Sequence, residues 1–353
     1  MLRRSCARLP LIAVLGLLLS CAGSTPKKET PTRAELSQKA SLIFGTLPRE
    51  AASRENIVTE AKINLGRKLY YDKRLSKNHD VACNSCHLLD RFGVDGDPTS
   101  TGHRGQVGGR NSPTVYNAAF QIAQFWDGRA ADVEEQAKGP PLNPIEMAMP
   151  SEDYVVRVLR SISGYAPLFD AAFPGEEPQI TYDQMARAIG AFERRLVTPS
   201  RFDKFQKGNL DVLSPDELWG LDLFMSVGCL TCHNGPLVGG AMYQKIGLLN
   251  AYPTDDLGRY EVSKLPADRY VFKVPSLRNV GQTGPYFHDG KVGTLDEAVR
   301  LMAYHQLDRK LTEQERTAVV AFLGSLTGRI DASYIAEPML PPNGPDTPAP
   351  DPS

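Results

Sequence analysis

CNSCH at residues 83–87 and CLTCH at residues 229–233 are the two stretches that decide the fold of this chain. In each, two cysteines stand three positions apart and a histidine follows at once. This is the spacing of a c-type haem attachment site, because two such thiols can reach the two vinyl groups of one porphyrin. The histidine that follows then lies under the iron as its proximal ligand. The pattern predicts two covalent haems, held by Cys83, Cys86 and His87 and by Cys229, Cys232 and His233.

The use of cysteine along the chain supports this interpretation. There are six cysteines, and Cys6 and Cys21 belong to the N-terminal leader. The other four are the two haem pairs, so no thiol is left for a structural disulfide. A single Cys-x-x-Cys could also be a zinc or redox site, but two copies with histidine in the fifth place favour haem.

Residues 1–20 have the form of a signal peptide. Arg3, Arg4 and Arg8 precede an apolar run, residues 9–19, that is too short for an ordinary membrane-spanning helix. The run ends in LLSC at residues 18–21, which resembles a bacterial lipobox. We therefore expect lipidation at Cys21, and the alternative is an ordinary signal peptide followed by a chance cysteine. Residues 21–50 then form a tether and lead-in.

Length and charge bound the remaining possibilities. The chain has 353 residues, which allows two domains of ordinary size, and a formal net charge of -1. A chain of this charge has no basic footprint for nucleic acid. We expect an N-terminal haem domain at residues 51–200 and a C-terminal one at 201–337. Residues 338–353 are rich in proline, and we expect them to be disordered.

The two halves align with each other, which predicts an internal duplication. Pro113 and Asn117 match Pro275 and Asn279, a shift of 162 in residue number (275 minus 113; 279 minus 117). DG at residues 127–128 and DG at residues 289–290 are separated by the same shift. The two pentads are only 146 apart, so the second half carries 16 extra residues after its haem site (162 minus 146). We expect two similar haem domains in one chain.

The expected fold class is mainly α, with two cytochrome c-like domains and long loops. Capping-box patterns predict helices that begin after Thr181, Ser214, Thr294 and Thr312. Glycine and proline are concentrated in residues 93–113 and 235–285, which read as loops. Loops of this length are unusual in a compact domain unless they are functional.

The alignment of the halves also shows where the two haem sites differ. Met302 in the second half falls on Pro140 in the first. A thioether can be the second axial ligand of a haem iron, and proline cannot. We expect Met302 to ligate the C-terminal iron, with Met242 as the rival ligand, while the N-terminal iron stays open. A helix methionine that packs in the core is the plainer alternative.

Several other residues of the first half are candidates for roles at the open haem. Trp126, which aligns with His288, would shorten an electron path between the haems if it is buried between them. His103 lies in a glycine-rich loop sixteen residues after His87 and can act as a removable ligand. Glu146 has apolar neighbours and can shuttle protons if its pKa is raised, although an ordinary surface glutamate would look the same.

These residues resemble those of the bacterial di-haem cytochrome c peroxidases, from about residue 60 to about residue 325. The motifs that carry the resemblance lie at residues 83–87, 99–103, 110–117, 124–130, 135–147, 229–233 and 272–290. The resemblance implies a low-potential peroxidatic haem at the first pentad and a high-potential haem at the second, with Met302. It further implies a displaceable distal His103, an inter-haem Trp126, and the distal pair Gln136 and Glu146.

The resemblance also implies cofactors, partners and a location. One calcium ion between the domains would take the Asn111 side chain and the carbonyls of Thr283 and Pro285, and oxygen ligands suit that cation. Hydrogen peroxide would be reduced with electrons from a small periplasmic cytochrome c or cupredoxin. The protein would be in the periplasm and touch the membrane only through its lipid anchor. The family also suggests a homodimer.

Two other function classes remain open from the sequence. One is a related di-haem enzyme that oxidises tryptophans of a partner protein. That group carries tyrosine at the position of Met302, so Met302 argues against it. The other is a di-haem electron-transfer cytochrome without catalysis, which would need no set of Gln136, Pro140 and Glu146.

Overall fold

The structure is a computed structural model that describes residues 31–353. The predicted signal peptide and Cys21 lie outside the described residues. Within the part that is described, no helix is long and apolar enough to cross a membrane.

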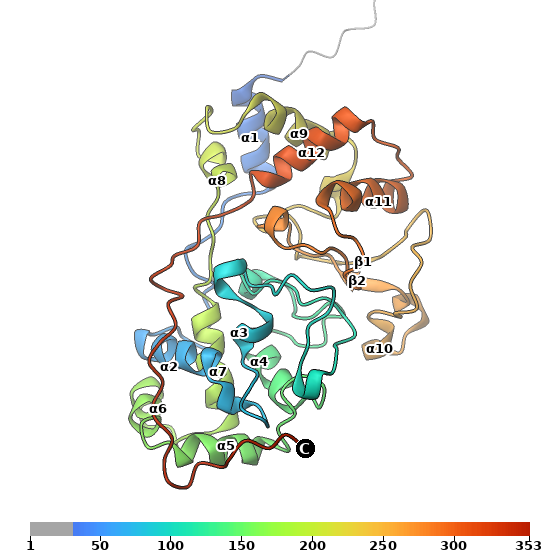
Figure 1. The fold of residues 1–353 in the computed structure, drawn as a ribbon. Coiled ribbons are helices and arrows are strands. Elements are labelled where there is room, and N and C mark those ends of the chain that lie inside the picture. The colour runs from blue at the N-terminus through green and yellow to red at the C-terminus, as the bar shows by residue number, and fades with distance from the viewer. Residues whose placement is uncertain (1–30) are drawn as a thin grey trace, which may run out of the picture. The chain divides into compact units, whose positions relative to one another are not determined.

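The fold is mainly helical, as predicted, and irregular segments join its elements (Figure 1). The two short strands pair antiparallel, with Gln244 opposite Phe272. The helices and strands are α1 (Arg33–Ile43), α2 (Glu60–Tyr71), α3 (Cys83–Cys86), α4 (Val133–Leu142), α5 (Glu152–Ser161), α6 (Ala166–Ala172), α7 (Tyr182–Glu193), α8 (Arg201–Gln206), α9 (Pro215–Ser226), β1 (Tyr243–Lys245), α10 (Tyr260–Ser263), β2 (Val271–Lys273), α11 (Leu295–Leu307) and α12 (Glu313–Gly324).

The four helix starts predicted from capping patterns are confirmed. Thr181, Ser214 and Thr312 each cap a helix and form a full capping box with the residue three positions on. Thr294 caps α11 by accepting from the backbone N–H of Glu297. Glu297 does not complete that box, because its carboxylate pairs with Arg300 instead. Each cap satisfies a backbone N–H that the helix itself leaves unpaired.

Each half has its own hydrophobic core, built around a crossing of two helices. In the first core α2 crosses α7, and in the second α9 crosses α12. A glycine stands at each crossing. A Cβ atom on Gly66 would lie 1.9 Å from the carbonyl oxygen of Ala188, and one on Gly220 would lie 1.9 Å from that of Ala318. Only glycine lets the two backbones approach so closely.

Residues before the first half contribute to the second core. Helix α1 buries Leu36 and Ala40 there, and Phe44 meets Phe202 edge to face with ring centroids 5.5 Å apart. The Ser37 hydroxyl donates to the carbonyl of Phe205 at 2.6 Å. Part of the expected tether and lead-in is therefore a packed helix, because its apolar face finds partners in the later half of the chain.

The proline-rich tail, residues 338–353, has no helix or strand but follows the first half of the molecule (Figure 1, dark red). Arg74 donates to the carbonyl of Pro341 at 2.8 Å, and Lys77 donates to that of Ser353 at 2.7 Å. This placement differs from the disorder that the composition predicts, because charged side chains of the first half bind the tail's carbonyl groups.

The same local geometry recurs at a fixed distance along the chain. Left-handed Asn117 and Asn279 have φ angles of 60° and 63°, and Phe125 and Phe287 have 64° and 69°. The residue numbers in each pair differ by 162 (279 minus 117; 287 minus 125). Isolated bridges Gln124–Ala130 and Tyr286–Val292 have that spacing too. The loops that carry the two DG turns thus share one backbone path.

Candidate active site

The first pentad opens onto an internal cavity. One turn of helix, α3, places the Cys83 and Cys86 thiols on the same side, and the Tyr70 hydroxyl donates to the carbonyl of His87 at 2.9 Å. Cys83, Cys86 and His87 all line this cavity, which has a volume of about 330 Å³. Burial lowers the pKa of His87, and its buried Nδ1 has no hydrogen-bond partner. A neutral imidazole is the form that binds iron, so these residues fit a haem.

The second pentad supplies a neutral histidine in a fixed orientation. His233 Nδ1 lies 3.3 Å from the carbonyl oxygen of Val238, which leaves the lone pair on Nε2. Burial lowers the pKa of His233 to about 4. Gly239 makes this approach possible, because a Cβ there would lie 2.2 Å from the carbonyl of Pro275 and 3.0 Å from His233 Nδ1. This histidine also fits an iron ligand.

The four thiols do not have the chemistry of a redox-active Cys-x-x-Cys. None of the described cysteines is in a disulfide. Burial raises the pKa of Cys83 and that of Cys229 to about 12, and that of Cys86 to about 11. Thiol–disulfide enzymes need a thiolate with a lowered pKa. Protonated, half-buried thiols instead suit attachment of an apolar porphyrin edge.

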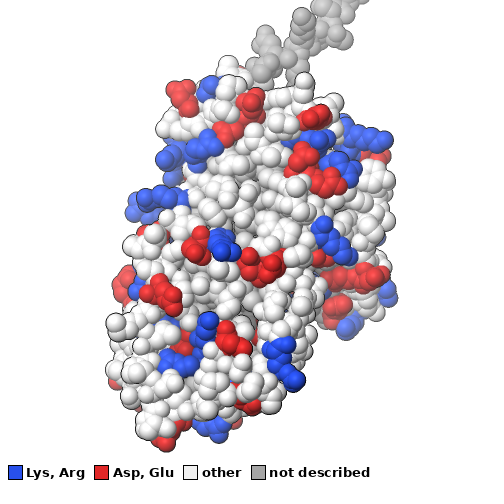
Figure 2. All heavy atoms as spheres, in the orientation of Figure 1, with Lys and Arg blue, Asp and Glu red and all other residues white. Residues whose placement is uncertain are grey.

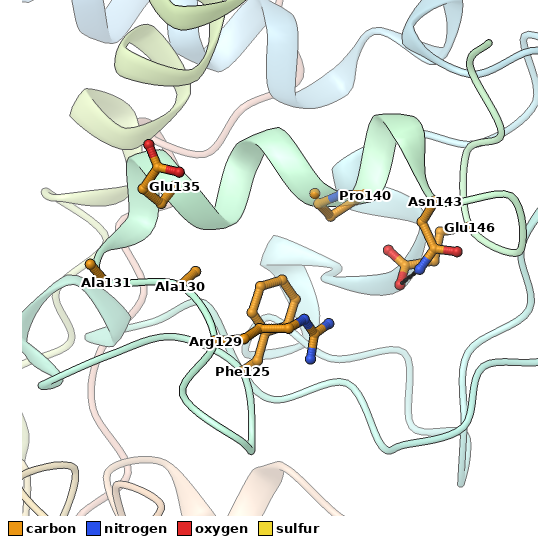
Figure 3. A pocket seen from close by; sticks show the side chains of 9 residues that line it. Phe125, Arg129, Ala130, Ala131, Glu135, Pro140, Asn143 and Glu146 are labelled. Atoms are coloured by element: carbon orange, nitrogen blue, oxygen red, sulfur yellow. Dashed lines mark hydrogen bonds between the residues drawn. The ribbon is translucent and has the colours of Figure 1, made fainter. Parts of the chain in front are cut away.

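Glu146 stands between the inner cavity and an outer pocket of about 510 Å³ (Figure 3). Burial raises the pKa of its carboxyl group, while the Arg129 guanidinium and a 2.7 Å hydrogen bond from Asn143 act in the opposite direction. Arg129 lies on Phe125 across the pocket, 3.4 Å from the ring centroid. A carboxyl group in this position can exchange protons with solvent on one side and with a cavity ligand on the other.

Helix α4 places the other predicted distal residues. Asp132 caps the helix, and Gln136 and Pro140 follow on it and line the inner cavity. Met302 lies on α11, eight residues after its cap Thr294, as Pro140 lies eight residues after Asp132. Met302 and its rival Met242 are both half-buried.

Trp126 joins the two halves. It lines the inner cavity, and its indole N–H donates to the carbonyl of Asn111 at 2.8 Å. The backbone N–H of Asn111 in turn donates to the carbonyl of His288 at 2.8 Å. The rings of Trp126 and His288 meet edge to face, with centroids 6.4 Å apart. The two residues that align in the repeat are therefore neighbours in space.

His103 is buried but is not among the residues that line the cavity, although Gly102 is. Its Nε2 lies 3.3 Å from the carbonyl oxygen of Ser353 in the tail, and its Nδ1 has no hydrogen-bond partner. Its backbone N–H donates to the carbonyl of Glu146 at 2.8 Å. The histidine ring thus turns toward the tail, while its backbone is hydrogen-bonded to that of Glu146.

The residues expected at a calcium site are neutral oxygen donors. The Asn111 side-chain nitrogen donates to the carbonyls of Asp97 and Pro98, at 3.1 and 3.3 Å, which leaves the amide oxygen for a cation. Thr283 and Pro285 lie just before His288, whose carbonyl binds Asn111. The described residues hold no group of three or more His, Cys, Asp or Glu side chains that could bind a metal. A site built from an amide and carbonyls contains none of these residue types.

Comparisons with known proteins identify the family. The family model for di-haem cytochrome c peroxidase matches residues 60–211. The chain is 47% identical to the cytochrome c551 peroxidase of Nitrosomonas europaea, over 80% of this chain and 84% of that protein. It is 42% identical to the cytochrome c551 peroxidase of Pseudomonas aeruginosa, over 96% and 98%. The chain belongs to the di-haem cytochrome c peroxidase family. The predicted family and enzyme class are thereby confirmed.

A solved structure is also similar to most of this chain. A MauG-like protein associated with microbial copper homeostasis is 30% identical and superposes with a TM-score of 0.74, covering 83% of this chain and 97% of that one. The family implies haem at both pentads, which agrees with the neutral histidines and protonated thiols found there.

One residue of this peroxidase's cavity was missed by the sequence analysis. Glu193, at the end of α7, lines the inner cavity and is 4% exposed. Burial raises its pKa to about 8, and the neighbouring Glu134 adds to the effect. The matching residue of α12 is Leu323, because Phe192 and Phe322 pack equivalently against Gly66 and Gly220. The sequence signal for Glu193 would have been a comparison of Phe-Glu at residues 192–193 with Phe-Leu at residues 322–323. These pairs are 130 residues apart (322 minus 192), so the alignment of the halves with a shift of 162 does not bring them together.

Proposed function

We propose that this protein reduces hydrogen peroxide to water in the N-terminal cavity, with two electrons from a small cytochrome c or cupredoxin. The observation that carries the proposal is Glu146, a carboxyl group of raised pKa placed between an open pocket and the cavity of the first pentad. The names of the relatives, both cytochrome c551 peroxidases, support the same reaction.

Two covalently bound haem c groups would supply the electron chemistry when present. Cys83, Cys86 and His87 would hold one, and Cys229, Cys232 and His233 the other, with Met302 as its second ligand. We infer that the two halves arose by duplication, which the recurrent loop geometry supports. Trp126 would carry electrons between the halves, since it lines the first cavity and contacts His288 of the second half.

The distal residues would manage the protons. Reduction of hydrogen peroxide consumes two electrons and two protons and yields two water molecules. Glu146 would take the proton from one oxygen of the peroxide and return it to the departing oxygen. The Asn143 amide orients this carboxyl group at 2.7 Å, and Gln136 would hold the peroxide by a hydrogen bond from the same cavity. Pro140 offers no ligating atom, so the cavity stays open.

We further propose that His103 is a gate. In the closed form it would enter the cavity and bind the first iron, and in the open form it would occupy the position seen here, against Ser353. A calcium ion on Asn111, Thr283 and Pro285 would couple the gate to the second half. Calcium would favour the open form only if its site differs between the two forms.

The proposed location is the periplasm, reached with the signal peptide of residues 1–20 and held by a lipid on Cys21. A homodimer is proposed from the family. Charges of both signs are interspersed on the face of the described residues that Figure 2 shows. Such a face suits brief encounters with a small redox protein better than a permanent partner of one charge.

Stopped-flow spectroscopy of the holoprotein tests the function. Fully oxidised and half-reduced protein would each be mixed with hydrogen peroxide, and both haem spectra followed. The half-reduced protein should react at once and oxidise a reduced donor cytochrome on repeated turnover. A half-reduced protein that leaves peroxide unconsumed would refute the proposal.

One alternative is the oxidation of tryptophans in a partner protein, the other di-haem activity that the sequence left open. Spectroscopy separates the two, because Met302 ligation of the second iron is incompatible with the tyrosine that the alternative uses at this position. Steady oxidation of a donor cytochrome by peroxide, without any partner protein, would exclude the alternative as the main activity.

A further inference from the structure

A row of aromatic rings leads from the wall of the N-terminal cavity to the surface of the second half. It begins at Trp126, whose ring lies 6.4 Å from that of His288 between centroids. His288 lies 6.0 Å from Tyr252, and Tyr252 lies 5.3 Å from His305. His305 lies 5.0 Å from Tyr304, which is 38% exposed on α11. Successive rings meet edge to face throughout.

The bridging histidines are held in place. His288 is 1% exposed, stacks on Phe272 at 4.2 Å, and has its Nε2 2.9 Å from the hydroxyl oxygen of Thr254. His305 is also buried, with Nδ1 2.8 Å from the carbonyl oxygen of Asn250. These contacts fix the ring-to-ring distances, so the row is a built feature and not a chance cluster of mobile side chains.

Tyr252 differs from the other tyrosines near it by its hydrogen-bond partner. Its hydroxyl donates to the Asp289 carboxylate, at 3.3 Å from Oδ1 and 3.2 Å from Oδ2. Burial and this carboxylate raise the pKa of Tyr252, so the phenol stays protonated. A phenol that loses an electron becomes a strong acid and needs a base for its proton. Asp289 is such a base, whereas the nearby Tyr286 donates to the carbonyl of Val280, which is not.

We propose that Tyr252 is a redox-active tyrosine, and that the row from Trp126 to Tyr304 is a one-electron path between the peroxide cavity and the surface. This inference rests on the proposed function, because peroxide reduction supplies the oxidant. The path works when peroxide arrives and no donor protein is bound. Its outer end, Tyr304, is 38% exposed, so a small one-electron reductant such as a phenol can reach it from solvent.

The electrons and protons of this step balance. Tyr252 gives one electron to the cavity by way of His288 and Trp126, and that electron replaces one of the two that peroxide reduction consumes. The phenol proton moves to Asp289, which leaves a neutral tyrosyl radical beside a neutral carboxyl group. An electron from a reductant at Tyr304 then restores the phenol, and Asp289 returns the proton.

Freeze-quench electron paramagnetic resonance of the holoprotein tests the proposal. Protein activated by one-electron reduction would be mixed with excess hydrogen peroxide in the absence of donor protein. The wild type should give a tyrosyl radical signal, and ring-deuterated tyrosine should narrow it. Tyr252→Phe keeps the ring packing and should lose most of the signal. Asp289→Asn removes the base and should weaken the signal as well.

Two further variants complete the test. Tyr286→Phe is the matched control. It removes a half-buried phenol of the same half, but this phenol has no carboxylate partner, so the signal should stay unchanged. With a small phenol added as the reductant, Tyr304→Phe should prolong the radical on Tyr252, because the route by which the phenol returns an electron is lost. A full radical signal in Tyr252→Phe would overturn the proposed electron path and leave the proposed peroxidase function standing. A wild type whose haem spectra do not respond to peroxide overturns the proposed function, and the path with it.

Discussion

The two halves of this peroxidase share a scaffold and differ in what they place around it. Both cross two helices over a glycine and both carry a loop with the same left-handed residues. At equivalent positions, however, the first half has Pro140 and Glu193 where the second has Met302 and Leu323. One fold can therefore surround its two pentads with different side chains, because an acid and a proline stand in the first half where a leucine and a methionine stand in the second.

Two carboxyl groups of the first half lie at its cavity. Glu146 faces both solvent and the cavity, and Glu193 is buried in the cavity wall. At the second pentad, burial lowers the pKa of His233 to about 4, and Leu323 belongs to the hydrophobic core against which Cys229 packs. The comparison shows that the carboxyl groups beside a haem-attachment pentad lie in the first half, where protons would have to reach the cavity.

The largest effect should come from removing the distal acid. Glu146→Gln keeps the shape and the bond to Asn143 but cannot move a proton, so turnover should fall by roughly 100-fold or more. Steady-state oxidation of a donor cytochrome by peroxide measures this. Glu135→Gln is the matched control, because Glu135 lines the same outer pocket but pairs with Lys138. Near-normal turnover in Glu146→Gln would contradict the assignment.

The second largest effect should come from removing Met302, the proposed axial ligand of the C-terminal haem. Met302→Leu removes the proposed thioether ligand, so the potential of the C-terminal haem should drop by on the order of 0.1 V or more. The near-infrared band of a thioether-ligated iron should vanish with it. Spectroelectrochemistry measures both, with Met242→Leu as the control. If Met242→Leu shows the loss and Met302→Leu does not, the ligand is Met242.

Removal of the proposed gate, His103, should change the spin state of the N-terminal haem alone. His103→Gly should give a high-spin N-terminal haem that meets peroxide without any reductant, while the C-terminal haem stays unchanged. Absorption and magnetic resonance spectra of the oxidised protein show the difference. A wild-type oxidised protein that is already high-spin and reacts at once would mean that His103 does not gate the cavity.

The smallest effect concerns stability and pH. The pKa of Glu193 is raised to about 8 in the folded protein, from 4.5 when exposed, so the unfolded state ionises first. The free energy of unfolding of the first half should therefore fall as the pH rises from about 4.5 to about 8. Denaturant titrations followed at the N-terminal haem measure this slope.

Reciprocal variants sharpen the test. Glu193→Leu makes the first half match the second and should flatten the slope, whereas Leu323→Glu should introduce a similar slope into the second half. A slope that persists in Glu193→Leu would show that another group causes it.

The tertiary structure also gives two terminal segments packing partners that composition does not reveal. Composition predicted a tether and lead-in before residue 50 and disorder after residue 338. Helix α1 instead packs its apolar face in the second core, and the tail lies along the first half at Arg74 and Lys77. Both placements depend on partners that are distant in the chain, Phe205 for Ser37 and Arg74 for Pro341, which no local pattern reveals.

The sequence by itself determined the mainly helical fold, the four helix starts, the two haem-attachment pentads and the family, because each rests on residues a few positions apart. Only the tertiary structure decided that Glu146 opens onto two spaces, that Glu193 is buried beside the first pentad, and that Trp126 touches His288. Burial and contact between distant segments set the pKa values and the ring distances. These quantities depend on how the two halves pack, and a linear motif does not contain them.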